Sequence, residues 1–186
     1  MPRSQLTSFE HVLLGMIFSQ PASGYDLKRR FATSPMGVYQ PSSGALYPAL
    51  DRLQRRGLLR SETSRPAAGG RPRRVYRLTP DGHEAHLGWL REPVRPATVA
   101  QDLGMHLLRF VLMADELPAE VLGFLASLRA ALAGFVATLE QASAGPDVAA
   151  NVAARLAVEH GRAVYRASLA WTEQAISTLG ERTAAG

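Results

Sequence analysis

Cysteine is absent from this 186-residue sequence. Disulfide bonds, thiol nucleophiles and cysteine-ligated zinc sites are therefore excluded. The first residues lack the long apolar stretch behind a basic start that marks a secretory signal, and no run approaches the roughly 18 to 20 apolar residues of a membrane-spanning helix. Hydrophobic residues make up 46% of the chain, as in a globular protein with a core. We therefore expect a soluble, cytoplasmic protein that does not enter a membrane.

Common enzyme motifs are missing as well. The sequence has no G-x-S-x-G nucleophile elbow, no glycine-rich phosphate loop and no H-E-x-x-H zinc motif. His83 and His86 are three residues apart in a helix-forming segment, but no cysteine or carboxylate cluster accompanies them, so no metal site is predicted. We predict that the protein is not an enzyme and requires no cofactor.

Acidic residues are scarce in the first half of the chain. Residues 1–90 contain 13 Lys and Arg against 6 Asp and Glu, a net charge of +7, whereas residues 91–186 contain 8 against 10, a net charge of −2. Twelve of the thirteen basic residues are arginines, whose guanidinium group binds phosphates and guanine edges in a bidentate manner. A solvated basic surface explains this composition equally well. The positions of the arginines must therefore decide between the two interpretations.

Three helices are predicted in the first half. Thr7 and Glu10 form a capping box before an apolar helical pattern. Ser23 and Asp26 form a second box before the next helix. A turn rich in Ser, Pro and Gly then leads to a third helix.

The third helix is expected over Ser43 to Arg56, with Gly57 as its C′ residue. Its apolar residues recur at i, i+4 and i+7, at Leu46, Leu50 and Leu53. Pro48 lies inside this pattern, where proline usually costs about 3 kcal/mol. We expect Pro48 to bend the first turn of the helix, with basic residues on the outer face.

A β-hairpin follows the third helix. Residues 58–63 and 74–78 read as extended strands, and the loop between them carries the sequence RPAAGGRP. Thr79 then caps a further helix with Pro80 at its first position. Helix, helix, turn, basic helix and basic hairpin is the order of a winged helix-turn-helix, in which a helix enters the major groove and a hairpin wing meets the neighbouring backbone.

Three segments resemble the PadR family of transcriptional regulators: SGYDL, PSSGALYPALDRLQRRGLL and GRPRRVYRLTPDG. The resemblance runs through residues 9–90. Tyr39 departs from it, because the family usually has tryptophan at this position, and the wing is extended. The resemblance implies a dimeric, usually repressing, DNA-binding protein that recognises an inverted repeat and is often released by a small, frequently aromatic, effector.

The predicted DNA-binding residues come from the resemblance and from the arginines of the third helix and the wing. They are Tyr25, Lys28, Ser42, Ser43, Ala45, Tyr47, Arg52, Arg55, Arg65, Arg71, Arg73 and Arg74.

The second half reads as helices over 98–114, 118–142 and 146–179. The middle helix carries a heptad seam with Leu125 and Leu132 among its a and d positions, and this seam is met either inside the subunit or across a dimer. The last helix has one charged stripe between two apolar flanks, so we expect two neighbours and infer a homodimer. The predicted dimerisation residues are Leu107, Phe110, Leu125, Leu132, Tyr165, Leu169, Trp171 and Ile176.

An effector site is expected near the junction of the two halves, where pockets tend to form. Its candidate residues are Trp89, His106, Phe110 and Trp171. An aromatic residue on a helix is more often part of a core than of a ligand site, so each candidate is weak by itself.

The prediction is a mainly α-helical protein with a small β-hairpin wing. Residues 1–90 form a winged helix-turn-helix DNA-binding domain, and residues 91–186 form an α-helical dimerisation and effector domain. The alternative is a helical protein- or RNA-interaction module without operator specificity. Duplex DNA is favoured because the deep, narrow major groove of RNA excludes a helix.

Overall fold

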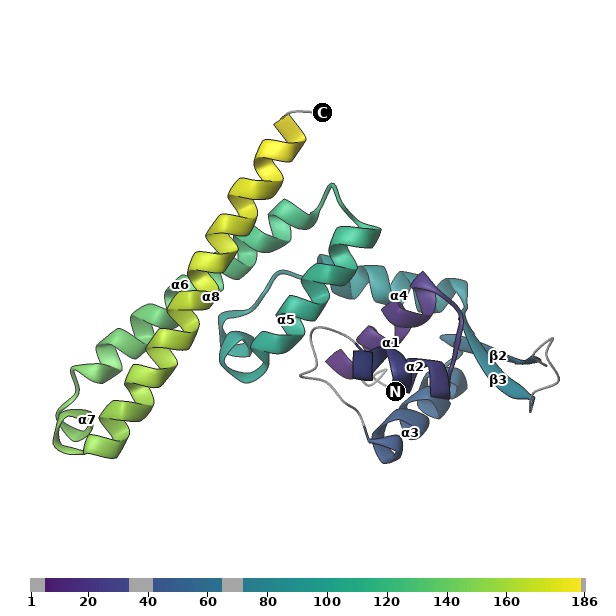
Figure 1. The fold of residues 1–186 in the computed structure, drawn as a ribbon, viewed down its shortest axis with the longest axis horizontal. Coiled ribbons are helices and arrows are strands. Elements are labelled where there is room, and N and C mark those ends of the chain that lie inside the picture. Colours follow the sequence, from purple (N-terminus) through teal and green to yellow (C-terminus); the bar gives the residue numbers. More distant parts are fainter. Residues whose placement is uncertain (1–5, 34–41, 65–71, 185–186) are drawn as a thin grey trace. The chain divides into compact units, whose positions relative to one another are not determined.

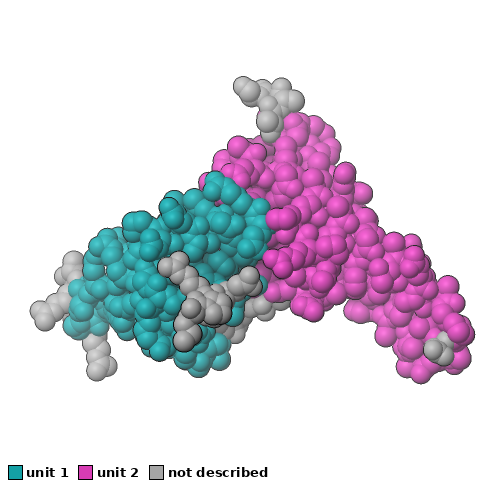
Figure 2. Space-filling view, turned by 180° about the vertical axis from the view of Figure 1, so that it is seen from behind, with its two compact units in different colours: residues 1–92 teal, residues 93–186 magenta. Residues whose placement is uncertain are grey.

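The computed structural model describes residues 6–33, 42–64 and 72–184. The chain divides into two compact units, Met1–Glu92 and Pro93–Gly186 (Figures 1 and 2). Within the described residues the chain is mainly helical, with one three-stranded antiparallel sheet in the first unit. This confirms the predicted fold class.

Unit 1 is a helical cluster with a small sheet (Figure 1). The sheet has the order β1-β3-β2, and the long β2–β3 hairpin pairs Ser61 with Tyr76. Its elements in chain order are α1 (Ser8–Ser19), β1 (Ala22–Ser23), α2 (Gly24–Thr33), α3 (Ser43–Arg55), β2 (Leu59–Ser64), β3 (Arg73–Leu78) and α4 (Pro80–Arg91). Leucines from three helices fill the core without measurable exposure: Leu13, Leu14, Leu27, Leu46, Leu50 and Leu53. Their burial fixes which face of α3 remains outside.

The predicted helix starts are confirmed. Glu10 N–H donates to Thr7 Oγ1 at 3.2 Å, while Thr7 N–H donates to Glu10 Oε2 at 2.9 Å. Ser23 and Asp26 exchange the same pair of bonds, at 3.0 and 3.2 Å. Thr79 accepts from the Gly82 N–H and precedes Pro80 in the first turn of α4. Each cap uses partners three residues apart, which is why the sequence reveals them.

Helix α3 differs slightly from its predicted bounds. Ser42 is the N-cap residue and Arg56 is the C-cap, so the helix begins at Ser43 as predicted and ends one residue earlier, at Arg55. The helix continues through Pro48. Gly57 follows with φ +75°, the left-handed conformation expected of a C′ glycine.

One glycine makes possible the close approach of α4 to the end of α3. A Cβ atom at Gly82 would lie 2.1 Å from the carbonyl oxygen of Leu58. The same carbonyl accepts the Thr79 N–H at 3.1 Å, and Thr79 Oγ1 donates to the carbonyl of Gly57 at 2.7 Å. The start of α4 is therefore held directly against the backbone that leads into the wing.

Unit 2 contains α5 (Pro96–Glu116), α6 (Val121–Ser143), α7 (Pro146–Ala150) and α8 (Val152–Ala184). Helix α5 is interrupted at Asp102, which has φ −151° and ψ 44°. The prediction of one continuous helix over 146–179 is wrong, because the chain leaves the helical conformation at Asn151. Asn151 Oδ1 accepts the Ala154 N–H at 3.1 Å and so caps the long helix.

The heptad seam of α6 is met inside the subunit. Helix α6 packs against α8 along its length and also against α5. Leu125, Leu128 and Leu132 have no exposed surface. Leu125 and Leu132 are therefore corrected from dimerisation residues to core residues of unit 2.

By length and composition, α6 also passes as a membrane-crossing helix, contrary to the expectation that no such run exists. Core helices of soluble proteins can have the same length and apolar composition, and one side of α6 is buried as in such a core helix.

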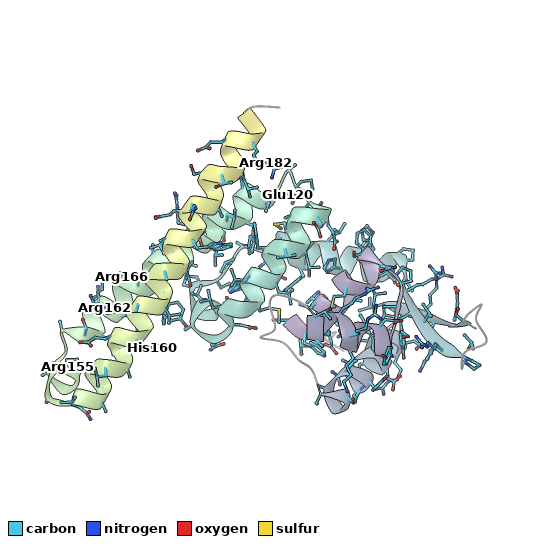
Figure 3. The ribbon with its side chains drawn as sticks, viewed as in Figure 1. Glu120, Arg155, His160, Arg162, Arg166 and Arg182 are labelled. Carbon is cyan, nitrogen blue, oxygen red and sulfur yellow. The ribbon has the colours of Figure 1, made fainter. Side chains whose placement is uncertain are left out.

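The two apolar flanks of α8 have different surroundings. Val158, Tyr165, Leu169 and Ile176 are half-buried, and the Tyr165 ring meets Phe135 of α6 edge-on at 4.6 Å. The other flank is exposed, by 59% at Val152, 56% at Leu156, 39% at Val164 and 36% at Trp171. Charged side chains such as Arg155, Arg162 and Arg166 also lie along this helix (Figure 3).

Candidate nucleic-acid interface

The outer side of unit 1 brings together the start of α2, the outer face of α3 and strand β3. We call this surface the helix–wing face. The described residues of the predicted DNA-binding set are all exposed: Tyr25, Lys28, Ser42, Ser43, Ala45, Tyr47, Arg52, Arg55, Arg73 and Arg74. Arg65 and Arg71 lie outside the described residues.

The first turn of α3 lies beside α2. Lys28 Nζ donates to Ser43 Oγ at 3.2 Å. A cation is thereby placed at the exposed start of the helix, beside Ser42 and Ser43.

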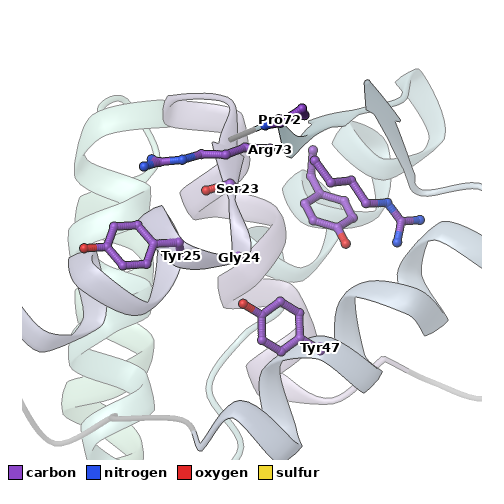
Figure 4. A pocket seen from close by; sticks show the side chains of 8 residues that line it. Ser23, Gly24, Tyr25, Tyr47, Pro72 and Arg73 are labelled. Carbon is purple, nitrogen blue, oxygen red and sulfur yellow. The ribbon is translucent and has the colours of Figure 1, made fainter. Parts of the chain in front are cut away.

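A hollow of about 400 Å³ separates α3 from the wing strand (Figure 4). Its lining consists mainly of tyrosine and arginine: Ser23, Gly24, Tyr25, Tyr47, Pro72, Arg73, Arg74 and Tyr76. The Tyr47 ring rests on Gly24, where a Cβ atom would lie 2.5 Å from Tyr47 Cε1. The absence of a side chain at Gly24 thus determines where Tyr47 sits.

The two wing arginines have different surroundings. The Arg73 guanidinium lies over the Tyr25 ring, 5.3 Å from its centroid, and 4.0 Å from the Asp26 carboxylate. Arg74 lies over Tyr76 at 5.2 Å. Burial raises the pKa of the Tyr76 hydroxyl, so this ring stays neutral beneath the cation.

Arg52 is tied to the core instead of standing free on the helix–wing face. Its Nε donates to Glu10 Oε1 at 2.9 Å, and the Glu10 side chain is 4% exposed. Burial by itself raises the pKa of Glu10, but hydrogen bonds from Thr7 and Arg52 together outweigh it and lower the pKa. The Arg52 guanidinium is half exposed, so the predicted DNA contact stays a prediction while its structural role is plain.

Sequence reasoning missed the polar residues of α3 that face the wing. Asp51, Gln54, Arg55 and Arg74 line a second, shallow hollow. Tyr47, Asp51 and Gln54 follow an i, i+4, i+7 spacing, which puts them on one face of α3. This spacing is the signal that identifies the wing-facing side of the helix.

The candidate effector residues do not form one cluster. Trp89 belongs to unit 1, where it stacks on His11 with ring centroids 4.9 Å apart. In unit 2, Phe110 meets Trp171 edge-on at 5.4 Å. His106, one turn before Phe110, is buried, and its Nε2 lies 3.2 Å from Thr98 Oγ1. Burial and the neighbouring Arg109 lower the pKa of His106, despite an opposing effect from Asp102.

The histidine pair of α4 is engaged by packing. His83 stacks on Phe18 at 4.5 Å, and His86 is fully buried. Within the described ranges, no group of three or more His, Cys, Asp or Glu residues is arranged to hold a metal ion.

Residues 13–86 match the model of the transcriptional regulator PadR-like family. The Mycobacterium tuberculosis transcriptional regulator Rv3488 is 53% identical over 47 residues, which are 25% of this chain and 42% of that protein. The chain thus spans less than half the length of the curated relative it matches. The family and this relative are both described as transcriptional regulators, in agreement with the prediction of a non-enzyme.

Two solved structures align with nearly the whole chain. The structure of Bacillus subtilis PadR in complex with operator DNA is 17% identical and covers 93% of this chain and 99% of that chain, with a TM-score of 0.45. The PadR-like regulator BC1756 from Bacillus cereus is 19% identical and covers 93% and 98%, with a TM-score of 0.39.

Proposed function

We propose that this chain, whose residues 13–86 match the transcriptional regulator PadR-like family, binds operator DNA with the helix–wing face of unit 1. The observation that carries the proposal is the outer surface of α3. Its inner leucines are fully buried, so its exposed serines, Tyr47 and Arg55 face outward beside the basic strand β3.

The physical basis is the fit of a basic helix to duplex DNA. An α-helix enters the major groove, its first turn approaches base edges, and flanking cations neutralise phosphates. Lys28 on α2, Arg55 on α3 and Arg73 on β3 are exposed cations that supply this charge. RNA is the weaker alternative, because its major groove is too narrow for α3.

We further propose a homodimer that forms through the exposed flank of α8. Exposed apolar side chains lie along one side of this 33-residue helix, at Val152, Leu156, Val164 and Trp171. An apolar surface of this kind is typically covered by a partner. A second copy of the chain satisfies this need with a self-complementary two-fold contact. Two heads related in this way recognise an inverted repeat with half-sites about 10 bp apart.

The proposed mode of action is repression that a small, aromatic effector relieves in the cytoplasm. Phe110, Trp171 and His106 of unit 2 remain the candidates for effector contact, since they offer aromatic faces and a buried imidazole in one region. Trp89 is dropped from this set because it packs within unit 1. An effector that favours one spacing of the two heads lowers operator affinity through linkage.

Selection of bound duplexes from random and genomic DNA tests the proposal. We expect an enriched inverted repeat whose affinity falls at least about 100-fold between roughly 50 and 200 mM salt, because several phosphates are neutralised. Arg55→Gln and Arg73→Gln should each reduce the salt slope by about one, since each substitution removes one cation that neutralises a phosphate. Arg129→Gln and Arg155→Gln remove equally exposed charges from unit 2 and serve as matched controls. No enrichment, or an affinity independent of salt, contradicts DNA binding.

A further inference from the structure

We infer that Arg74 is a positioning residue that holds the wing against α3, and that its main contribution to DNA recognition is geometric. The inference rests on the proposed DNA binding and assigns a different role to one of the predicted contacts. It concerns Arg74, Gln54 and Ser61, which belong to β3, α3 and β2.

These three side chains close a ring of hydrogen bonds. Arg74 Nε donates to Ser61 Oγ at 3.0 Å, and Arg74 Nη2 donates to Gln54 Oε1. Gln54 Nε2 donates to the same Ser61 Oγ at 3.3 Å. Arg74 Nη1 also lies 3.5 Å from Asp51 Oδ1. Each side of the Arg74–Gln54–Ser61 ring therefore joins a different pair of elements.

The sheet register places the ring on the face toward α3. Ser61 pairs with Tyr76, and Arg74 is two residues before Tyr76 on the same face of β3. Tyr76 is 3% exposed, and its ring supports the Arg74 guanidinium at 5.2 Å. The guanidinium thus has hydrogen bonds at its edges and an aromatic face below.

Arg73 provides the internal contrast. It has the same charge and nearly the same side-chain exposure, 52% against 50%. Its contacts are the Tyr25 ring and an Asp26 carboxylate oxygen at the 4.0 Å limit. Arg73 is therefore the cation that is more available to phosphate, whereas each of the three Arg74 guanidinium nitrogens has a partner within the protein.

Substitution of Arg74 by lysine distinguishes the effect of the charge from that of the hydrogen-bond geometry. Lysine keeps the positive charge but lacks the planar fork of donors that reaches Ser61 and Gln54 together. Specific recognition needs α3 and the wing in one fixed arrangement, while non-specific binding depends on charge. Arg74→Lys should therefore weaken specific recognition and leave non-specific binding unchanged.

The experiment compares Arg74→Lys with Arg73→Lys in the full chain. The probes are the duplex recovered by selection and a scrambled duplex of equal length. For Arg74→Lys we expect about a tenfold or larger loss of affinity for the selected duplex, the equivalent of one or two net hydrogen bonds, with unchanged salt slope and unchanged affinity for the scrambled duplex. Arg73→Lys should stay within about twofold of the wild type on both probes, because a point charge still serves a phosphate.

Gln54→Ala is the second variant, because it breaks the ring without changing any charge. It should reproduce the Arg74→Lys phenotype, and the double variant should be no worse than either single one, as expected for residues that act as a unit. If Arg74→Lys binds the selected duplex as the wild type does, or if Gln54→Ala and Arg74→Lys add independently, the positioning role is wrong.

A measurement without DNA separates this inference from the proposed function. Hydrogen exchange of the β2 and β3 amides should accelerate in Arg74→Lys and Gln54→Ala but not in Arg73→Lys. Unchanged exchange in all three overturns the ring's role. A wild-type protein that fails to distinguish the two duplexes overturns DNA recognition instead, whatever the exchange result.

Discussion

The two units are stabilised by different kinds of contact. In unit 1, polar side chains join elements that are far apart in the sequence: Arg52 bonds to Glu10, and Arg30 Nη1 donates to the carbonyl oxygens of Met16 and Gln20 at 2.9 and 3.1 Å. In unit 2, apolar faces pack α6 between α5 and α8, and side-chain bonds between its helices, such as Tyr165 Oη to the Ala100 carbonyl and Arg166 to Glu140, are exposed. The exposed large apolar residues of unit 1 include Tyr25 and Tyr47 on the helix–wing face, whereas those of unit 2 include one flank of α8.

This difference suits the two proposed tasks. A DNA-reading surface needs side chains at fixed positions, and directional hydrogen bonds fix them. A dimerisation surface needs apolar area, which is not directional. Each unit contains one of the two tryptophans, Trp89 and Trp171. Variants with Trp171→Phe or Trp89→Phe therefore report on the unfolding of each unit separately.

The largest expected effect is that of Gly82→Ala on unit 1. The new Cβ atom meets the Leu58 carbonyl oxygen, a backbone atom that already accepts the Thr79 N–H, so α4 has to move away. We expect the free energy of unfolding, measured by denaturant titration of Trp89 fluorescence, to fall by about 3 kcal/mol, the upper end of the usual cost of overpacking. Trp171 should report little change.

Gly88→Ala is the matched control on the same helix, because nothing lies within 4 Å of a Cβ atom there. It should be neutral or stabilise by up to about 1 kcal/mol, the helix propensity difference. Equal effects of the two substitutions would falsify the close packing of α4 on the wing backbone.

The second effect concerns the open flank of unit 2. Val164→Ser should weaken dimerisation by about 1 to 2 kcal/mol, or roughly tenfold, because the interface loses a buried apolar side chain. Sedimentation velocity over a concentration series measures this change. Unfolding of unit 2 in the monomer should change little, since Val164 is 39% exposed there.

Val111→Ser is the control for this variant. Val111 is similarly exposed, at 43%, but lies on α5 and outside the α8 flank. A wild-type chain that sediments as a monomer, or equal weakening by both substitutions, argues against the α8 flank as the dimer surface.

Local features were predictable from the sequence, and features that depend on distant residues were not. The capping boxes, Gly57 and the heptad seam involve neighbours within one or two turns, so residue spacing reveals them. The break at Asn151 carries no glycine or proline at that residue and escaped prediction. Periodicity also could not tell which helix meets the α6 seam.

The candidate site shows the same limit. Spacing predicted that arginines gather on α3 and the wing, but it did not identify their partners. Arg52 bonds to Glu10, 42 residues away, and Arg74 bonds to Gln54, 20 residues away. No periodic pattern links such pairs. Which arginines bond to partners within the protein therefore became visible only in the fold.

The smallest predicted effect is a pH dependence of unit 1 below pH 4.5. The pKa of Glu10 in the folded protein is lowered below its ordinary value of 4.5. A depressed carboxyl pKa stabilises the fold above the ordinary value, and this stabilisation is lost as the pH falls through the folded pKa. The pKa of Asp26 is also lowered, mainly by its bond from Ser23, so Glu10 accounts for only part of the acid sensitivity.

Glu10→Gln isolates that part. The amide keeps an oxygen acceptor for the Thr7 N–H but loses the charge that pairs with Arg52, so unit 1 should lose about 1 kcal/mol at neutral pH. Its stability should then change less than that of the wild type as the pH falls below 4.5, measured by Trp89 fluorescence in denaturant. Glu62→Gln is the control, since Glu62 is 54% exposed and pairs with Arg60 and Arg77 only at the surface, where such pairs contribute under about 1 kcal/mol. Identical acid profiles for Glu10→Gln and the wild type would mean that apolar packing, and not the Glu10–Arg52 bond, holds α3 to α1, and the contrast between the two units would then be much weaker.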